Sequence, residues 1–221
     1  MQFSSILLFA SAAIAASSVK RQTTVVGSSL EAADILSDVV AANLAAIQDA
    51  VVDVVENGSE IVDEVVAAIL SENLVEIAEA IEEATEIIVG VTTGAAGGVL
   101  AGAVGLTQAQ IDQLVQAIDT IKDALSQIGA TIEVTVDGLT PAILGLVGDS
   151  IDAVEELIAP LVTPIASFID AVQAVTVSIG IDLRGLGAVE RALASVLRDL
   201  VDSLGLSNLS PVLMLLLGLL P

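Results

Sequence analysis

Acidic and apolar residues alternate with a helical period near the start of the chain. In residues 29–56 the acidic positions recur at steps of three and four, and at about 100° per residue they share an arc of about 100°. The remaining arc is mostly Ala, Val, Leu and Ile. The pattern predicts a helix over 29–56. We expect it to end at Asn57-Gly58, because both residue types tolerate the left-handed conformation of a helix end.

A second helical pattern covers residues 60–89, with Ser59 as its predicted N-cap. The acids before Ser71 and those after it are rotated by about 100° on a helical wheel. In one straight helix, the apolar face would therefore change position around the helix axis at this point. The pattern predicts a break, with Ser71 as the N-cap of a new helix.

An uncharged stretch rich in glycine follows, over residues 87–106, where glycines at 90, 94, 98 and 102 stand four apart. If helical, it has a bare stripe that lets another backbone approach closely. If not helical, it is an apolar linker between two halves of the chain. Its length also matches a membrane span.

The clearest amphipathic helix is predicted over residues 107–128. Thr107 and Gln110 form a capping box at its start, and Gly129 marks its end. One face is uniformly apolar and consists of Ile111, Leu114, Val115, Ile118, Ile121, Leu125 and Ile128. Beyond it, residues 131–136 alternate between apolar and polar side chains, which predicts a short strand, a poor helix or an extended connection.

The last third of the chain also has a helical pattern. Thr140-Pro141 begins a helix with Pro at its first position, and Pro160 and Pro164 are predicted to divide residues 142–179 into two pieces. Asp182 or Gly185 opens a last amphipathic helix that runs to residue 204. The end of the chain, residues 211–221, is wholly apolar.

The first twenty-one residues have the order of an export leader. A short apolar run over residues 6–10 precedes Ala13-Ile14-Ala15, a small-residue cleavage site. The dibasic pair Lys20-Arg21 then resembles the processing site of secreted proteins of filamentous fungi, where a kexin-like protease cuts after Lys-Arg. We therefore expect a secreted protein, extracellular or in the cell wall, whose mature chain begins at Gln22.

Composition excludes most catalytic sites. The chain has neither Cys nor His, so a Ser-His-Asp triad, a thiol nucleophile and an ordinary zinc site are ruled out. The acids stand at the spacing of solvated helix faces, which argues against a carboxylate-pair hydrolase or a calcium site. The net charge of −23 repels nucleic acid. We expect no enzyme, no cofactor and no metal.

Three short signals predict modification. Asn57-Gly58-Ser59 and Asn208-Leu209-Ser210 are N-glycosylation sequons. Ser203 could be the attachment site of a glycolipid anchor, with residues 212–221 as the apolar tail of the signal. The alternative for that tail is a terminal segment docked on the bundle.

One segment carries a family resemblance. Residues 106–128 read LTQAQIDQLVQAIDTIKDALSQI. Together with the leader, this segment resembles secreted helical proteins of filamentous fungi, grouped with the hydrophobic-surface-binding and cell-wall mannoprotein families. The resemblance implies an amphipathic helical bundle that coats surfaces or holds lipids.

The predicted fold is all-α, an amphipathic multi-helix bundle formed as one body or as two halves joined by the Gly-rich segment. The predicted regions are a leader (1–21), an acidic helical region (22–89), a Gly-rich apolar segment (90–106), a helical region (107–204) and an apolar tail (205–221).

The leading hypothesis for function is a non-catalytic surface protein that binds apolar surfaces or lipids. Its binding face would consist of Ile111, Leu114, Ile118 and Leu125; alternatively, these residues form the core. A membrane-inserting or pore-forming protein would instead use residues 87–106, and a structural wall component would need no ligand. Such a chain could form a homo-oligomer or contact a membrane peripherally. We expect no nucleic-acid partner.

Overall fold

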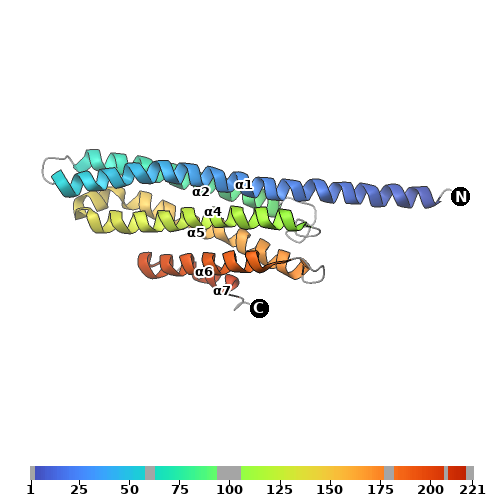
Figure 1. Cartoon of the computed structure of the whole chain (residues 1–221). Coiled ribbons are helices and arrows are strands. Elements are labelled where there is room, and N and C mark those ends of the chain that lie inside the picture. The colour runs from blue at the N-terminus through green and yellow to red at the C-terminus, as the bar shows by residue number, and fades with distance from the viewer. Residues whose placement is uncertain (1–2, 58–62, 94–105, 177–181, 207–208, 218–221) are drawn as a thin grey trace.

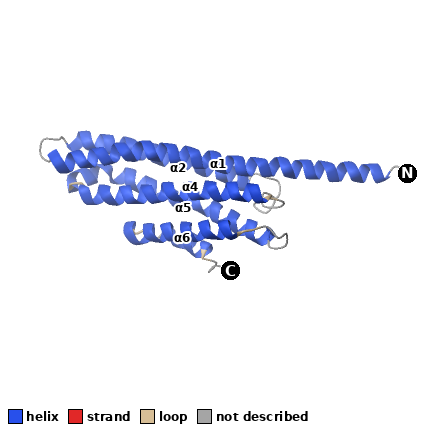
Figure 2. Ribbon diagram, in the orientation of Figure 1, coloured by secondary structure: helices blue, strands red, loops and turns tan. Residues whose placement is uncertain are grey.

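The computed structural model describes residues 3–57, 63–93, 106–176, 182–206 and 209–217; of residues 3–24, 53–57, 91–93, 175–176 and 215 it describes the backbone alone. The described residues form helices and no strand, which confirms the all-α prediction (Figure 2). The helices are α1 (Phe3–Asn57), α2 (Asp63–Thr93), α4 (Gln108–Gly138), α5 (Pro141–Thr176), α6 (Arg184–Leu204) and α7 (Ser210–Leu216).

The helices pack side by side as a bundle, and the N-terminal part of α1 extends beyond the others (Figure 1). α1 and α2 pack on one another, α4 packs on α1, and α5 packs on α2. α6 packs on α4, and the short α7 contacts both α5 and α6. One apolar core includes side chains of all six helices, so the helices before and after the Gly-rich segment share it.

Helix α1 ends at Asn57 as predicted but begins much earlier than Ser29. Val25 and Val26 are buried in the core, and the Ser29 hydroxyl donates to the Val25 carbonyl at 2.9 Å. Ser29 therefore lies inside the helix. The helix continues back to Phe3, and no proline interrupts this part of the chain.

The predicted break at Ser71 is wrong, because α2 runs through it without interruption. Of the acids before Ser71 that suggested the break, Asp63 and Glu64 lie in the first turn of α2 and are exposed, whereas Glu60 and the predicted N-cap Ser59 lie outside the described residues. The end of a helix can be open to solvent on every side, and negative charge there is favoured by the helix dipole. A change of acidic face in the first turn therefore requires no second helix.

The capping box that begins α4 is confirmed. The Gln110 amide donates to the Thr107 hydroxyl at 3.3 Å, and the Thr107 amide donates to the Gln110 side chain at 2.9 Å. The predicted end at Gly129 is wrong, because α4 continues to Gly138 through residues 131–136. Gly129 is buried, and a Cβ there would overlap the Leu200 side chain of α6. Glycine at this position permits close helix packing.

The start of α5 at Pro141 is confirmed, with the Thr140 hydroxyl accepting from the Ile143 amide at 3.4 Å. The predicted division at Pro160 and Pro164 is wrong, because both prolines lie inside one helix. Pro160 is exposed, so water can satisfy the carbonyl that loses its amide partner. The opposite face stays continuous because it is buried, through Ile158, Leu161, Val162, Ile165, Ala166 and Ile169.

Helix α6 follows the predicted amphipathic pattern but is not the last helix. It ends at Gly205, whose φ of 71° is left-handed and whose amide donates to the Val201 carbonyl. The apolar tail then forms α7, with Val212 and Leu216 buried.

Candidate functional site

The apolar face predicted on α4 lies in the core. Ile111 and Leu114 are 1% and 2% exposed, and Ile118 and Leu125 are 2% and 0% exposed. Of the two interpretations given for these residues, burial in the core is therefore the one that applies to this conformation. A ligand could reach them only if neighbouring helices moved.

Four helices surround a small cavity beside this face. Its volume is about 20 Å³, enough for about one water molecule. The cavity is lined by Ser29 of α1, Ile88 of α2, Leu114, Ala117, Ile118 and Ile121 of α4, and Ile165 and Phe168 of α5. Only Ser29 brings a hydroxyl, so the interior of the bundle suits an apolar group.

Three sides of this interior are closed by pairs of helices that pack directly on one another, but the side between α4 and α5 is not. α1 packs closely on α2 and α4, and α2 packs closely on α5, whereas α4 and α5 make few contacts with each other. α6 lies on α4, and α7 joins α6 to α5, on the side away from α1 and α2 (Figure 1). We call α6 and α7 together the cover. Its buried side chains are mainly aliphatic and include Leu186, Val189, Leu193, Leu197 and Leu200 of α6.

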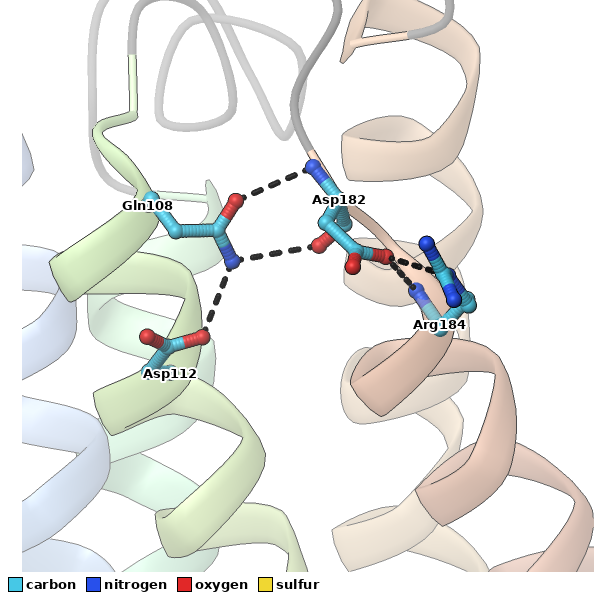
Figure 3. Close-up of polar contacts among 4 residues, drawn as sticks. All are labelled: Gln108, Asp112, Asp182 and Arg184. Carbon is cyan, nitrogen blue, oxygen red and sulfur yellow. Dashed lines mark hydrogen bonds and ion pairs between the residues drawn. The ribbon is translucent and has the colours of Figure 1, made fainter.

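A polar contact holds the start of the cover to α4 (Figure 3). The Gln108 side chain donates to the Asp182 carbonyl at 3.1 Å and accepts from the Asp182 amide at 3.0 Å. It also donates to Asp112 at 2.9 Å. The Asp182 carboxylate accepts from the Arg184 amide, at the first residue of α6, at 2.9 Å. Gln108 therefore links the first turn of α4 to the segment that leads into α6.

A second polar contact joins α6 to α5. The Gln173 side chain donates to the Glu190 carboxylate at 2.6 Å. Burial raises the pKa of Glu190 and is the largest effect; nearby Asp170 also raises it, while the Gln173 hydrogen bond and Arg191 lower it. Burial likewise raises the pKa of Asp170. The α5–α6 contact therefore holds carboxylates that are costly to ionise.

A surface groove of about 160 Å³ lies between α4 and α6, beside the Gly129–Leu200 contact. Ser126, Ala130 and Glu133 of α4 and Val196, Asp199 and Ser203 of α6 also line it. Ser203, the predicted anchor attachment site, is exposed here on α6. Its modification stays a prediction.

The other predicted sites are not brought together. Lys20 and Arg21 lie on α1, where only the backbone is described, and Asn57 is the last residue of α1. Asn208 and residues 94–105 of the Gly-rich segment lie outside the described residues. In the ranges that the structure describes, no three acidic side chains are placed to hold a metal ion.

Sequence reasoning missed the contacts that fix the cover. Gln108 and Asp182 are 74 residues apart, and neither belongs to a motif that predicts the pairing. Gly129 was visible as a special position, but a buried glycine and a terminating glycine look alike in a sequence.

Two described segments, Val25–Val52 and Pro141–Ala174, are long and apolar enough to cross a membrane. Helices buried in the core of a soluble protein meet the same criterion, and both segments contribute to the core here. Comparison with protein-family models, with curated proteins and with solved structures gives no match for this chain.

Proposed function

We propose that this chain is a non-catalytic, secreted protein of the cell wall or extracellular space that binds apolar surfaces or lipids with the interior of its bundle. The observation that carries the proposal is the closure of the α4–α5 side. An aliphatic interior there is covered by α6 and α7, with few contacts between α4 and α5 themselves. When the cover moves away, the buried face of α4 becomes available to a ligand.

The energetics favour an exchange of apolar contacts. Each buried Leu or Val side chain of α6 contributes about 1.5–3 kcal/mol by leaving water, so the cover stays closed in solution. An acyl chain or an uncharged apolar surface could replace these contacts and so offset the cost of opening. Charged headgroups are poorer partners, because the chain carries a net charge of −23.

The same acidity is consistent with a protein that must stay dissolved until it meets a surface. The hydrophobic fraction of the chain is 55%, and strong net charge opposes aggregation of such a composition. The absence of Cys and His supports a role in binding over one in catalysis.

A second candidate is insertion into a bilayer. It is favoured by Pro141–Ala174, a segment of α5 that is long and apolar enough to span a membrane and that lies on the side covered by α6 and α7. Insertion would use this segment in place of the Gly-rich one first considered.

The cover can be loosened without touching the apolar interior. Gln108→Ala removes the polar link between α4 and α6, and Gln127→Ala changes an exposed glutamine on the same helix as a matched control. The variant loses two exposed hydrogen bonds, and a net loss of about 1 kcal/mol raises the open population about fivefold. We expect Gln108→Ala to adsorb about fivefold faster to uncharged apolar beads and phosphatidylcholine vesicles, and Gln127→Ala to match the wild type.

Equal adsorption by all three proteins would contradict the proposal. Release of a dye trapped in the vesicles, increased by Gln108→Ala, would favour insertion over surface binding. Binding to beads and vesicles without dye release would favour the first function.

A further inference from the structure

The three arginines of α6 form one row on its outer face. Arg184, Arg191 and Arg198 stand seven residues apart and are exposed. Seven residues turn a helix by about 700°, so successive members are offset by only about 20°. The row lies opposite the buried face of α6 that packs on the bundle. We call it the arginine row.

Two members of the arginine row form no ion pair within the described part of the chain, although Arg191 lies near enough to Glu190 to lower the pKa of that carboxyl. Arg184 pairs with Asp182 at 3.2 Å, but Arg191 and Arg198 form no ion pair with a described carboxylate. This holds in a chain with 29 acidic residues and only 6 basic ones. The two guanidinium groups therefore remain available to an acidic surface on another molecule.

The outer face of α2 carries the matching pattern in acids. Glu72, Glu79 and Glu86 also stand seven residues apart, and all are exposed. Glu76 and Glu83 lie between them and are exposed as well. We call these five the glutamate row. From first to last residue, both rows cover fourteen residue steps, about 21 Å of helix, so their charges repeat at the same interval.

The glutamate row has no cation of its own. The chain carries no Lys or Arg between Gln22 and Ile121, so neither α2 nor the part of α1 that packs on it supplies one. Within one molecule the two rows cannot meet, because α2 and α6 make no contact among the described residues and lie on opposite sides of the bundle (Figure 1).

We propose that the arginine row of one copy of this chain docks on the glutamate row of a second copy. We choose a second copy as the partner because the two rows have opposite charge and the same seven-residue spacing. Each copy has one row of each kind, so the contact is heterologous and joins copies head to tail in a growing chain. One pair of helices over about 21 Å buries less than the roughly 800 Å² per partner of a standard interface, so association is weak and depends on concentration.

The net charge of −23 opposes association at very low salt. At about 0.1 M salt, repulsion beyond about 10 Å is screened, while groups in contact still attract. Sedimentation velocity at about 0.1 M salt over a concentration series is therefore the suitable measurement.

Two variants separate the rows. Arg191→Glu/Arg198→Glu makes the outer face of α6 acidic, and Glu79→Arg/Glu86→Arg makes the outer face of α2 basic. We expect the wild type to form species larger than a monomer, and each variant alone to associate at least about tenfold more weakly. A mixture of the two variants restores association, because each then offers a face that complements the other.

A control matches the change in net charge. Glu31→Arg/Asp38→Arg alters two exposed acids of α1 and shifts the charge by the same amount as the α2 variant, 2 + 2 = 4. We expect it to associate at least as well as the wild type. Circular dichroism checks that all variants keep their helices.

Three results would overturn the proposal: a monomeric wild type at every concentration, a mixture that does not associate, or a control as impaired as the α2 variant. Phosphatidylserine vesicles test the rival occupant of the arginine row. Binding to them that is lost in Arg191→Glu/Arg198→Glu, without any self-association of the wild type, would assign the row to anionic lipid instead.

Discussion

The packing of α6 on α4 predicts that one methyl group at Gly129 destabilises the bundle. Alanine at a helical glycine normally stabilises a protein by about 0.5–1 kcal/mol. At Gly129 the new Cβ would overlap the end of the buried Leu200 side chain. The Leu200 methyl group must shift to make room, and overpacking of a core costs about 1–3 kcal/mol, to be set against the gain in helix propensity. We therefore expect Gly129→Ala to lower the free energy of unfolding by about 1 kcal/mol.

Gly145→Ala on α5 is the matched control, because nothing lies within 4 Å of a Cβ built there. We expect it to raise stability by about 0.5–1 kcal/mol. The gap between the two variants is then about 2 kcal/mol, or roughly 4–8 °C in melting temperature for a chain of this length. Thermal and urea unfolding followed by circular dichroism measure it.

A double-mutant cycle with Leu200→Ala assigns the effect to this contact. Leu200→Ala alone should cost about 2–5 kcal/mol, and less in the Gly129→Ala background, with a coupling energy of about 0.5–3 kcal/mol. If Gly129→Ala stabilised the protein as much as Gly145→Ala does, the close approach of α4 and α6 would be refuted.

Three further predictions concern the core and its acids. Thr135→Val should stabilise the protein by about 1 kcal/mol in urea unfolding, because the Thr135 hydroxyl is buried without a hydrogen-bond partner among the described residues; a loss of stability would reveal a partner. Burial raises the pKa values of Glu155, Asp170 and Glu190 in the folded state, so these groups destabilise the fold above those values, and the effect fades as pH falls through them. Melting temperature should therefore increase from about pH 7 towards about pH 5, and a decrease would show that other, stabilising carboxylates dominate. Ile118→Asp should cost about 4 kcal/mol or more and abolish cooperative melting, because it places an unpaired charge in the core; a helical, cooperative variant would show that this face is not buried.

Local signals in the sequence were reliable where the structure depends on neighbouring residues alone. The capping box of Thr107 and Gln110 marks the start of α4, and Thr140-Pro141 marks the start of α5. In both places a side chain satisfies an amide three residues away, so no distant part of the chain is needed. The apolar stripe of α4 was also visible in the sequence, but the sequence left open whether it was a binding face or core, and the structure buries it.

Signals that usually interrupt a helix misled the prediction where tertiary packing decides. Pro160 stays inside α5 because the opposite face is buried and the proline faces solvent. Gly129 stays inside α4 because Leu200 occupies the space that a side chain would fill. Propensity is a weak guide against such packing, and the partner helix is not visible from the local sequence.

For the candidate site, the sequence predicted the apolar character of its residues but not their arrangement in space. The pattern indicated that α4 has an apolar face, but not that this face lines an interior closed by α6 and α7. That arrangement depends on contacts such as Gln108–Asp182, between residues far apart in the chain. The seven-residue spacing of the arginines can be seen in the sequence. The sequence does not show that α6, which carries them, lies on the opposite side of the bundle from α2.

A reversible lock on the cover tests the central claim most directly. The chain has no cysteine, so Gly129→Cys/Leu200→Cys introduces a single pair, at a place where a Cβ added to Gly129 would contact the Leu200 side chain. Adsorption of this variant to uncharged apolar beads is measured oxidised and after reduction, with the wild type treated in the same way. If α6 must leave α4 to expose the binding face, the oxidised variant fails to adsorb and reduction restores adsorption. Equal adsorption of the oxidised and reduced forms would contradict the account.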